Sequence, residues 1–146
     1  MAISGDTLFA VCADTSVTWW DLRAARCLRT IRNAHDRIVN GCAALPGGTF
    51  ASVARDLKLK VWHPDGRCDV HSTPHRNSIK CVAASPDGRL LATGGYHGML
   101  AVFDLQTETW TTNRPTTSGI SSLIWHPQRE RFVASSYDGL LYEVGP

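Results

Sequence analysis

The chain has 146 residues and a mass of 16.0 kDa, enough for one domain with a hydrophobic core. Its 43% hydrophobic residues, 19% charged residues and net charge of +2 are typical of a globular protein and lack the strongly basic character of a nucleic-acid-binding domain. The N-terminal residues do not resemble a secretory signal, and no stretch is long and apolar enough to span a bilayer. The five cysteines are an odd number and make a poor disulfide framework. We therefore expect a cytoplasmic protein, or a nuclear one, with reduced thiols.

A unit of about 41 residues repeats along the chain. Segments 43–66, 83–106 and 124–144 align with one another, and segment 9–22 is an earlier partial copy. Each copy has a turn residue that is followed six positions later by a large apolar residue. The turn residues are Asp14, Asp56, His97 and Asp138, and the apolar residues are Trp20, Trp62, Phe103 and Val144. Both series have spacings of 42, 41 and 41 residues. This constant register predicts one supersecondary unit used four times.

Short β-strands are predicted within each unit. Residues 2–4 open the chain as the expected tail of an inner strand, before the partial copy. The second unit has four runs rich in Val, Leu, Phe and Trp, bounded by Gly, Asp and Pro and without a helical period, at 38–44, 49–54, 57–63 and 67–71. The third unit follows the same order, and the last unit stops after its third strand. About fifteen strands result, four to a complete unit, as in a propeller blade.

The joint pattern resembles the WD40 family, whose repeat has a histidine early and a Trp-Asp pair late. The pair stands at 20–21, partial versions of it stand at 62–63 and 103–104, and His35 and His75 match the early histidine. The resemblance implies an all-β domain of about four WD40 β-propeller blades, incomplete at both ends, each a four-stranded antiparallel sheet. As one domain over residues 1–146, its blades are expected near 1–33, 34–74, 75–114 and 115–146.

The resemblance also implies a buried hydrogen-bond tetrad, for which the second unit has all four residues: His35, Ser52, Asp56 and Trp62. Tryptophan only donates, a hydroxyl accepts and donates, neutral imidazole does both, and a carboxylate accepts. A fully satisfied chain of hydrogen bonds is therefore expected, and such a chain stiffens a blade.

The other blades are expected to have incomplete tetrads. The third unit keeps His75 and Thr93 but has His97 and Phe103 in place of the aspartate and the tryptophan. The fourth unit has no histidine at its start, where segment 115–119 stands instead.

Binding of other proteins is the function that the resemblance implies, because a propeller holds many loops on stiff sheets. We expect a non-catalytic scaffold or adaptor without a cofactor. In this family the usual binding surface is the rim of the central channel, formed by residues that enter the inner strands and by residues that precede the turn aspartate. Carried over to this sequence, the rim residues are Asn40, Arg55, Lys80, Tyr96, Ser121 and Tyr137.

Three alternative interpretations of the polar residues are open. Cys68, His71 and His75 have zinc-like spacing, but an outer strand explains them better, so no metal is expected. His35, Ser52 and Asp56 superficially resemble a hydrolase triad, although the sequence has no nucleophile elbow. A cluster of arginines at 23–32 is compatible with nucleic acid, or with the solvated face of an edge strand. A nucleic-acid-associated or ligand-sensing propeller domain of a larger regulatory protein is the main alternative function.

The two ends of the pattern lead to one more expectation. Propellers close with roughly four to eight blades, and an open end exposes unpaired backbone groups. We therefore expect the remaining blades to come from a longer chain of which this is the C-terminal half, from a second copy, or from a second polypeptide. The first of these is favoured.

Overall fold

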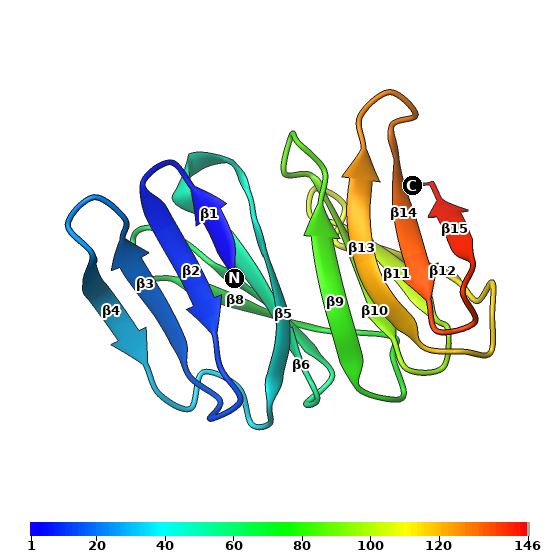
Figure 1. The fold of residues 1–146 in the computed structure, drawn as a ribbon, viewed down its shortest axis with the longest axis horizontal. Coiled ribbons are helices and arrows are strands. Elements are labelled where there is room, and N and C mark those ends of the chain that lie inside the picture. Colours follow the sequence, from blue (N-terminus) through cyan, green and yellow to red (C-terminus); the bar gives the residue numbers. More distant parts are fainter. Residues whose placement is uncertain (146) are drawn as a thin grey trace.

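The computed structural model describes residues 1–145, and within them fifteen strands form four antiparallel sheets (Figure 1). This all-β architecture of repeated sheets confirms the predicted fold class. No helix in these residues has the length and apolar character needed to cross a bilayer.

The strands occur in chain order within each sheet, so that every strand pairs with its neighbours in sequence. The first sheet contains β1 (Ala2–Ser4), β2 (Thr7–Val11), β3 (Val17–Asp21) and β4 (Arg26–Ile31). The second contains β5 (Val39–Ala44), β6 (Phe50–Ala54), β7 (Lys58–Trp62) and β8 (Cys68–Ser72), with the 3-10 turn η1 (Pro46–Gly48) after β5. The third contains β9 (Ile79–Ala84), β10 (Leu90–Gly95), β11 (Leu100–Asp104) and β12 (Thr109–Asn113). The fourth has three described strands, β13 (Ile120–His126), β14 (Arg131–Ser136) and β15 (Leu141–Val144).

The tight turns predicted from Gly and Asp connect these strands. In the turn between β9 and β10, the Gly88 amide donates to the Ser85 carbonyl and the Asp87 carboxylate accepts from the Arg89 amide. Gly88 has a φ of 73°, in the left-handed region that glycine adopts without steric cost. A meander of short hairpins is the result, and each sheet is one blade.

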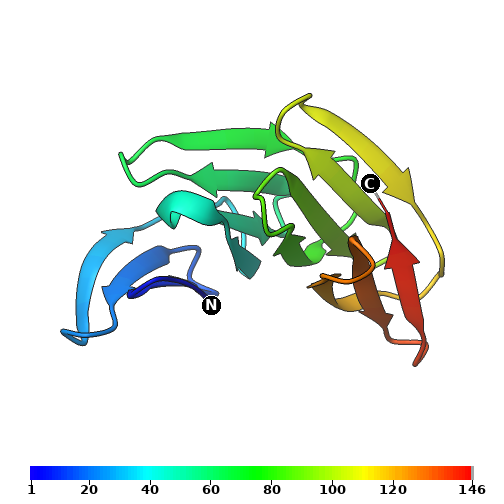
Figure 2. The same ribbon diagram turned by 90° about the horizontal axis from the view of Figure 1, so that it is seen from above.

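The four blades follow one another in an open arc (Figure 2). The first strand of each sheet, β1, β5, β9 or β13, lies next to the first strand of the neighbouring sheet, so these are the inner strands. β1 has only three residues, as the expected tail of an inner strand would.

Apolar side chains pack the faces of neighbouring blades together. Between the first and second blades, Phe9 stacks on Phe50 with ring centroids 5.0 Å apart, and Trp62 joins the same cluster. The second and third blades meet through a cluster that includes Ala51, Leu59, Ile79, Leu91 and Phe103. The third and fourth meet through one that includes Ala92, Leu100, Ile120, Phe132 and Val144. Each inner blade therefore buries both of its faces.

The outward face of the fourth blade has no such neighbour within residues 1–145. Leu59 and Leu100, one repeat apart, are 0% and 1% exposed, whereas Leu141, at the same position of the next repeat, is 72% exposed. Ile124 lies on this face with Leu141, and both line a shallow, mostly apolar groove. The fourth blade thus presents to solvent the face that the preceding blades bury.

Candidate functional site

The second blade contains a continuous chain of four side chains. Trp62 Nε1 lies 2.9 Å from Ser52 Oγ, Ser52 Oγ lies 2.8 Å from His35 Nε2, and His35 Nδ1 lies 2.8 Å from Asp56 Oδ2. Because indole can only donate, Ser52 accepts from Trp62 and donates its own proton to His35. His35 then donates through Nδ1 to the Asp56 carboxylate.

The environment keeps this histidine neutral. Burial lowers the pKa of His35, and it outweighs the opposite effect of the Asp56 carboxylate beside the ring. The carboxylate also accepts from the backbone amides of Asp36 and Lys58. This chain of hydrogen bonds therefore holds the loop before β5, strands β6 and β7, and the turn between those two strands in fixed positions relative to one another.

Ser52 cannot serve as a nucleophile in this position. Its side chain is fully buried, and its hydroxyl is shared between Trp62 and His35. A nucleophile has to be reachable by substrate and to stand beside an oxyanion site. The arrangement that resembles a hydrolase triad is a structural hydrogen-bond chain.

The third blade has only part of this chain of hydrogen bonds. His75 Nε2 lies 2.9 Å from Thr93 Oγ1, and the Thr93 hydroxyl donates to the Ala101 carbonyl at 3.1 Å. His97 occupies the turn position, and its ring accepts from Asn77 Nδ2 at 2.8 Å instead of contacting His75. Burial lowers the pKa of His75 to about 4. Among residues 1–145, the buried histidine of this blade therefore has no carboxylate partner.

The fourth blade uses a threonine in place of the histidine. Thr116 Oγ1 donates to Asp138 Oδ2 at 2.5 Å, and the Tyr142 hydroxyl donates to the same oxygen at 2.8 Å. These hydrogen bonds hold the pKa of Asp138 at about 2. The start of this blade is thus tied to its turn without an imidazole.

Three of the six rim residues are the extra residues of β-bulges. The pairing of each inner strand with its neighbour shifts by one residue near the start of β5, β9 and β13, and the residues skipped there are Asn40, Lys80 and Ser121. Bulges redirect a side chain and are frequent beside functional sites. Asn40 Nδ2 donates to the Ile79 carbonyl of the next blade at 2.7 Å, and Ser121 Oγ hydrogen-bonds Ser135 Oγ at 2.8 Å.

The other three rim residues share one backbone position. The amides of Arg55, Tyr96 and Tyr137 donate to the carbonyls just before the inner strands, those of Ile38, Ser78 and Gly119. The antiparallel pairing brings these positions to the same end of the blades as the bulges. Tyr137 is 62% exposed and Tyr96 38% exposed, with the Lys80 ammonium 4.9 Å from the centroid of the Tyr96 ring. All six rim residues therefore lie at one end of three neighbouring blades.

The zinc-like motif does not form a cluster. Cys68 packs against the apolar cluster between the first and second blades, whereas His71 contacts the ring of Phe103, 4.6 Å away, between the second and third. His75 is hydrogen-bonded to Thr93. No group of three or more His, Cys, Asp or Glu side chains in the part of the chain that the structure describes has the arrangement of a metal site.

The arginines at 23–32 belong to the first blade and the loops beside it. Arg23 pairs with Asp6 through Nε at 2.7 Å, and the guanidinium of Arg29 lies 5.2 Å from the centroid of the Trp19 ring. Both side chains thus have partners within the first blade, as the solvated face of an edge strand would.

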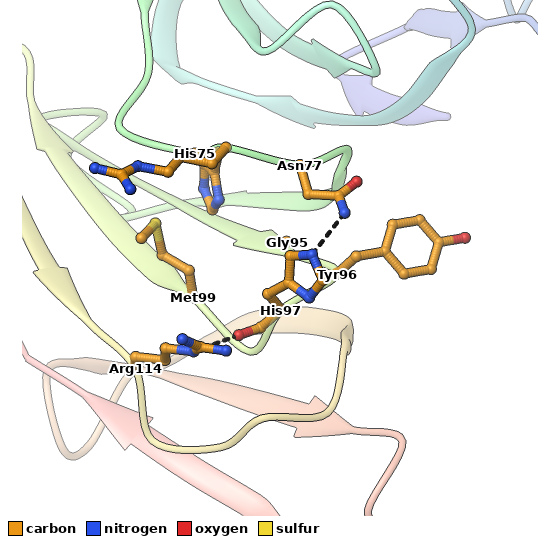
Figure 3. A pocket seen from close by; sticks show the side chains of 8 residues that line it. His75, Asn77, Gly95, Tyr96, His97, Met99 and Arg114 are labelled. Carbon is orange, nitrogen blue, oxygen red and sulfur yellow. Dashed lines mark hydrogen bonds between the residues drawn. The ribbon is translucent and has the colours of Figure 1, made fainter.

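Figure 3 shows a pocket in the third blade that the sequence did not predict. It has a volume of about 250 Å³ and lies between the loop before β9 and the turn between β10 and β11. Its lining residues are His75, Arg76, Asn77, Gly95, Tyr96, His97, Met99 and Arg114. The sequence signal was the replacement of the turn aspartate by His97, which predicts a broken tetrad but not the space beside it.

The chain spans less than half the length of the curated relatives it matches. It is similar to the intraflagellar transport protein 80 homolog of Rattus norvegicus, with 36% identity over 51% of this chain and 9% of the relative. It is also similar to the DDB1- and CUL4-associated factor 10 of Danio rerio, with 30% identity over 79% of this chain and 22% of the relative. A third relative is the target of rapamycin complex subunit wat1 of Schizosaccharomyces pombe, with 23% identity over 86% of this chain and 41% of the relative.

The family model for the WD domain, G-beta repeat, matches three segments, at residues 25–63, 66–104 and 107–142. Each segment begins before the outer strand of one blade and continues through the first strands of the next, so the sequence repeat is offset from the blade by one strand. The repeats, the four sheets and the hydrogen-bond chain of the second blade agree with one another, and the chain belongs to the WD40 repeat family.

Proposed function

We propose that the chain is a non-catalytic adaptor module that binds other proteins through the rim residues. The observation that carries this proposal is the equivalent placement of these residues on three blades, at bulges and beside turns, with two exposed tyrosines among them. Tyrosine and arginine are enriched among residues that dominate protein interfaces. The names of two relatives, a factor associated with DDB1 and CUL4 and a subunit of a target of rapamycin complex, support membership in protein assemblies.

A second kind of partner follows from the two outward faces of the arc. The face of the fourth blade that carries Leu141 is related by the repeat to faces that pack against a following blade. We propose that further WD40-type blades cover it, from the same longer polypeptide, a second copy or another chain. The cytoplasm, with the nucleus as alternative, stays the predicted location.

The rim is tested by affinity purification of the tagged protein from its own cells. The double variant Tyr96→Ala/Tyr137→Ala should lower the affinity for the co-purifying proteins at least about thirtyfold and so reduce their recovery, because a central aromatic residue of an interface contributes about 2 kcal/mol or more. The matched control is Val70→Ala, since Val70 is an exposed apolar residue of outer strand β8, away from the rim.

Recovery of the same proteins at wild-type yield by the double variant would contradict the rim assignment. Equal losses in the double variant and in Val70→Ala would also contradict it. Circular dichroism melting curves of the purified variants establish that both remain folded.

A further inference from the structure

The pocket of the third blade is lined by groups that suit an anion. Two arginines, two histidines and an asparagine are among its lining residues, and no aspartate or glutamate is. Neither Arg76 nor Arg114 forms an ion pair with any residue in 1–145. Arg114 donates through Nε to the His97 carbonyl at 2.8 Å, which leaves its two terminal nitrogens to other acceptors (Figure 3).

The ring of a buried histidine borders this pocket. His75 is 5% exposed, and the ring nitrogen that it uses for its hydrogen bond to Thr93 is Nε2. Within residues 1–145 its Nδ1 has no hydrogen-bond partner. A Cβ at Gly95 would lie 2.7 Å from this Nδ1, so a glycine at this position keeps the edge of the ring open.

The second blade indicates what such an edge binds. There His35 Nδ1 donates to a carboxylate oxygen of Asp56, 2.8 Å away, and the same oxygen accepts from the amide of Asp36. One repeat later the residue at the position of Asp56 is His97, which turns toward Asn77 and lines the pocket. The pocket therefore takes the place of the carboxylate that completes the tetrad in the preceding blade.

We propose that this pocket binds a glutamate or aspartate side chain from an acidic segment of a partner protein, so that the partner's carboxylate takes the place beside His75 that Asp56 has beside His35. The proposal deepens the adaptor function, on which it rests, because it names the chemistry of one partner segment. Charge-assisted hydrogen bonds from Arg76 or Arg114 would strengthen the contact, and neutral side chains would lose them.

Binding would change the tautomer of His75. In the free protein Thr93 donates to the Ala101 carbonyl, so the imidazole proton is on Nε2 and donates to Thr93. A carboxylate at Nδ1 requires the proton on that nitrogen. The Thr93 hydroxyl then donates to Nε2, the direction that Ser52 has toward His35 in the second blade. One proton moves from Nε2 to Nδ1 through solvent, and the net charge of the ring is unchanged.

The test measures fluorescence anisotropy of a labelled oligoglutamate peptide, and of its oligoglutamine counterpart, with the purified protein. We expect the oligoglutamate peptide to bind and the oligoglutamine peptide not to bind. Arg114→Gln should weaken binding about tenfold, the equivalent of one charge-assisted hydrogen bond. The matched control is Arg37→Gln, an exposed arginine in the corresponding loop of the preceding blade, which should bind as the wild type does.

His97→Asp is the decisive variant. It supplies the carboxylate within the chain, at the position that Asp56 has in the second blade, so it should abolish oligoglutamate binding and raise the melting temperature. In nitrogen-15 NMR spectra of the free wild type, Nε2 of His75 should have the chemical shift of a protonated ring nitrogen and Nδ1 that of an unprotonated one. Addition of the peptide should reverse this assignment.

Binding by His97→Asp and Arg114→Gln at wild-type affinity would overturn the proposal, as would an equal loss in Arg37→Gln, which would indicate general charge attraction. Tyr137 lies outside the pocket, so Tyr137→Ala should keep oligoglutamate binding. Because Tyr96 lines both the rim and the pocket, Tyr137→Ala alone separates the two proposals: it should lower the recovery of co-purifying proteins and leave oligoglutamate binding unchanged.

Discussion

At the scale of single residues, two replacements separate the tetrad of the second blade from its counterpart in the third, His97 for Asp56 and Phe103 for Trp62. Trp62 donates to Ser52 and so determines the direction of every hydrogen bond in the tetrad. Phe103, one repeat later, cannot donate, and its ring instead stacks on Trp110 with centroids 4.6 Å apart. The hydrogen-bond capacity of a side chain can be read from the sequence, so the composition of the tetrad was predictable. The pocket beside His75 was not, because it depends on the direction in which His97 turns.

We predict that Trp62→Phe and His35→Ala each lower the free energy of unfolding by about 1 to 3 kcal/mol, because each leaves a buried polar partner without its hydrogen bond. The urea midpoints of the purified variants measure the loss. Trp20→Phe is the matched control. Trp20 is the residue at the same repeat position in the first blade, is 38% exposed, and donates only to Thr18 on its own strand.

The control should keep its urea midpoint close to that of the wild type. Tetrad variants with the wild-type midpoint would show that the hydrogen-bond chain contributes nothing to stability.

At the scale of elements, the strands were predictable and the bulges were not. Alternating apolar residues and regular turn signals place the strands of the second blade within one or two residues of their observed bounds. A bulge leaves no such trace, because it depends on the hydrogen-bond register between two strands. The placement of Asn40, Lys80 and Ser121 at one end of the blades could therefore be inferred only from the family pattern.

The repeat register also predicts how much each equivalent leucine contributes. We expect Leu100→Ala to cost about 2 to 5 kcal/mol, since Leu100 is buried between the third and fourth blades and its truncation leaves a cavity. Leu141→Ala removes the same atoms from the equivalent position, which is exposed in the single chain, and should cost less than about 0.5 kcal/mol at dilutions where the chains do not associate. Thermal and urea unfolding measure both. Equal losses at the two positions would contradict the assignment of the interblade faces.

At the scale of the whole molecule, the offset between repeat and blade explains how the arc holds together. Each sequence repeat begins before one blade's outer strand and continues into the inner strands of the next, so the repeat itself connects neighbouring blades. Each inner sheet then packs one face against the preceding blade and the other face against the following blade. In the second blade, Phe50 and Trp62 pack against the preceding blade. The first blade has Leu8 and Trp20 at the same repeat positions, and the face that bears them points outward from the arc. The two outward faces of the arc are thus the two halves of an interblade contact.

This complementarity predicts that purified residues 1–146 associate in solution. Burial of exposed apolar area contributes about 25 cal/mol per Å², and the face with Ile124 and Leu141 offers the same kind of surface that the inner blades bury. Light scattering should give a mass above the 16.0 kDa of one chain. Leu141→Glu should shift the molecules toward one chain, because association would bury an unpaired carboxylate. Val70→Glu, an exposed position on β8 outside both faces, should not do so. A mass of one chain for the wild type at high protein concentration, unchanged by Leu141→Glu, would contradict the prediction that these faces take up further blades.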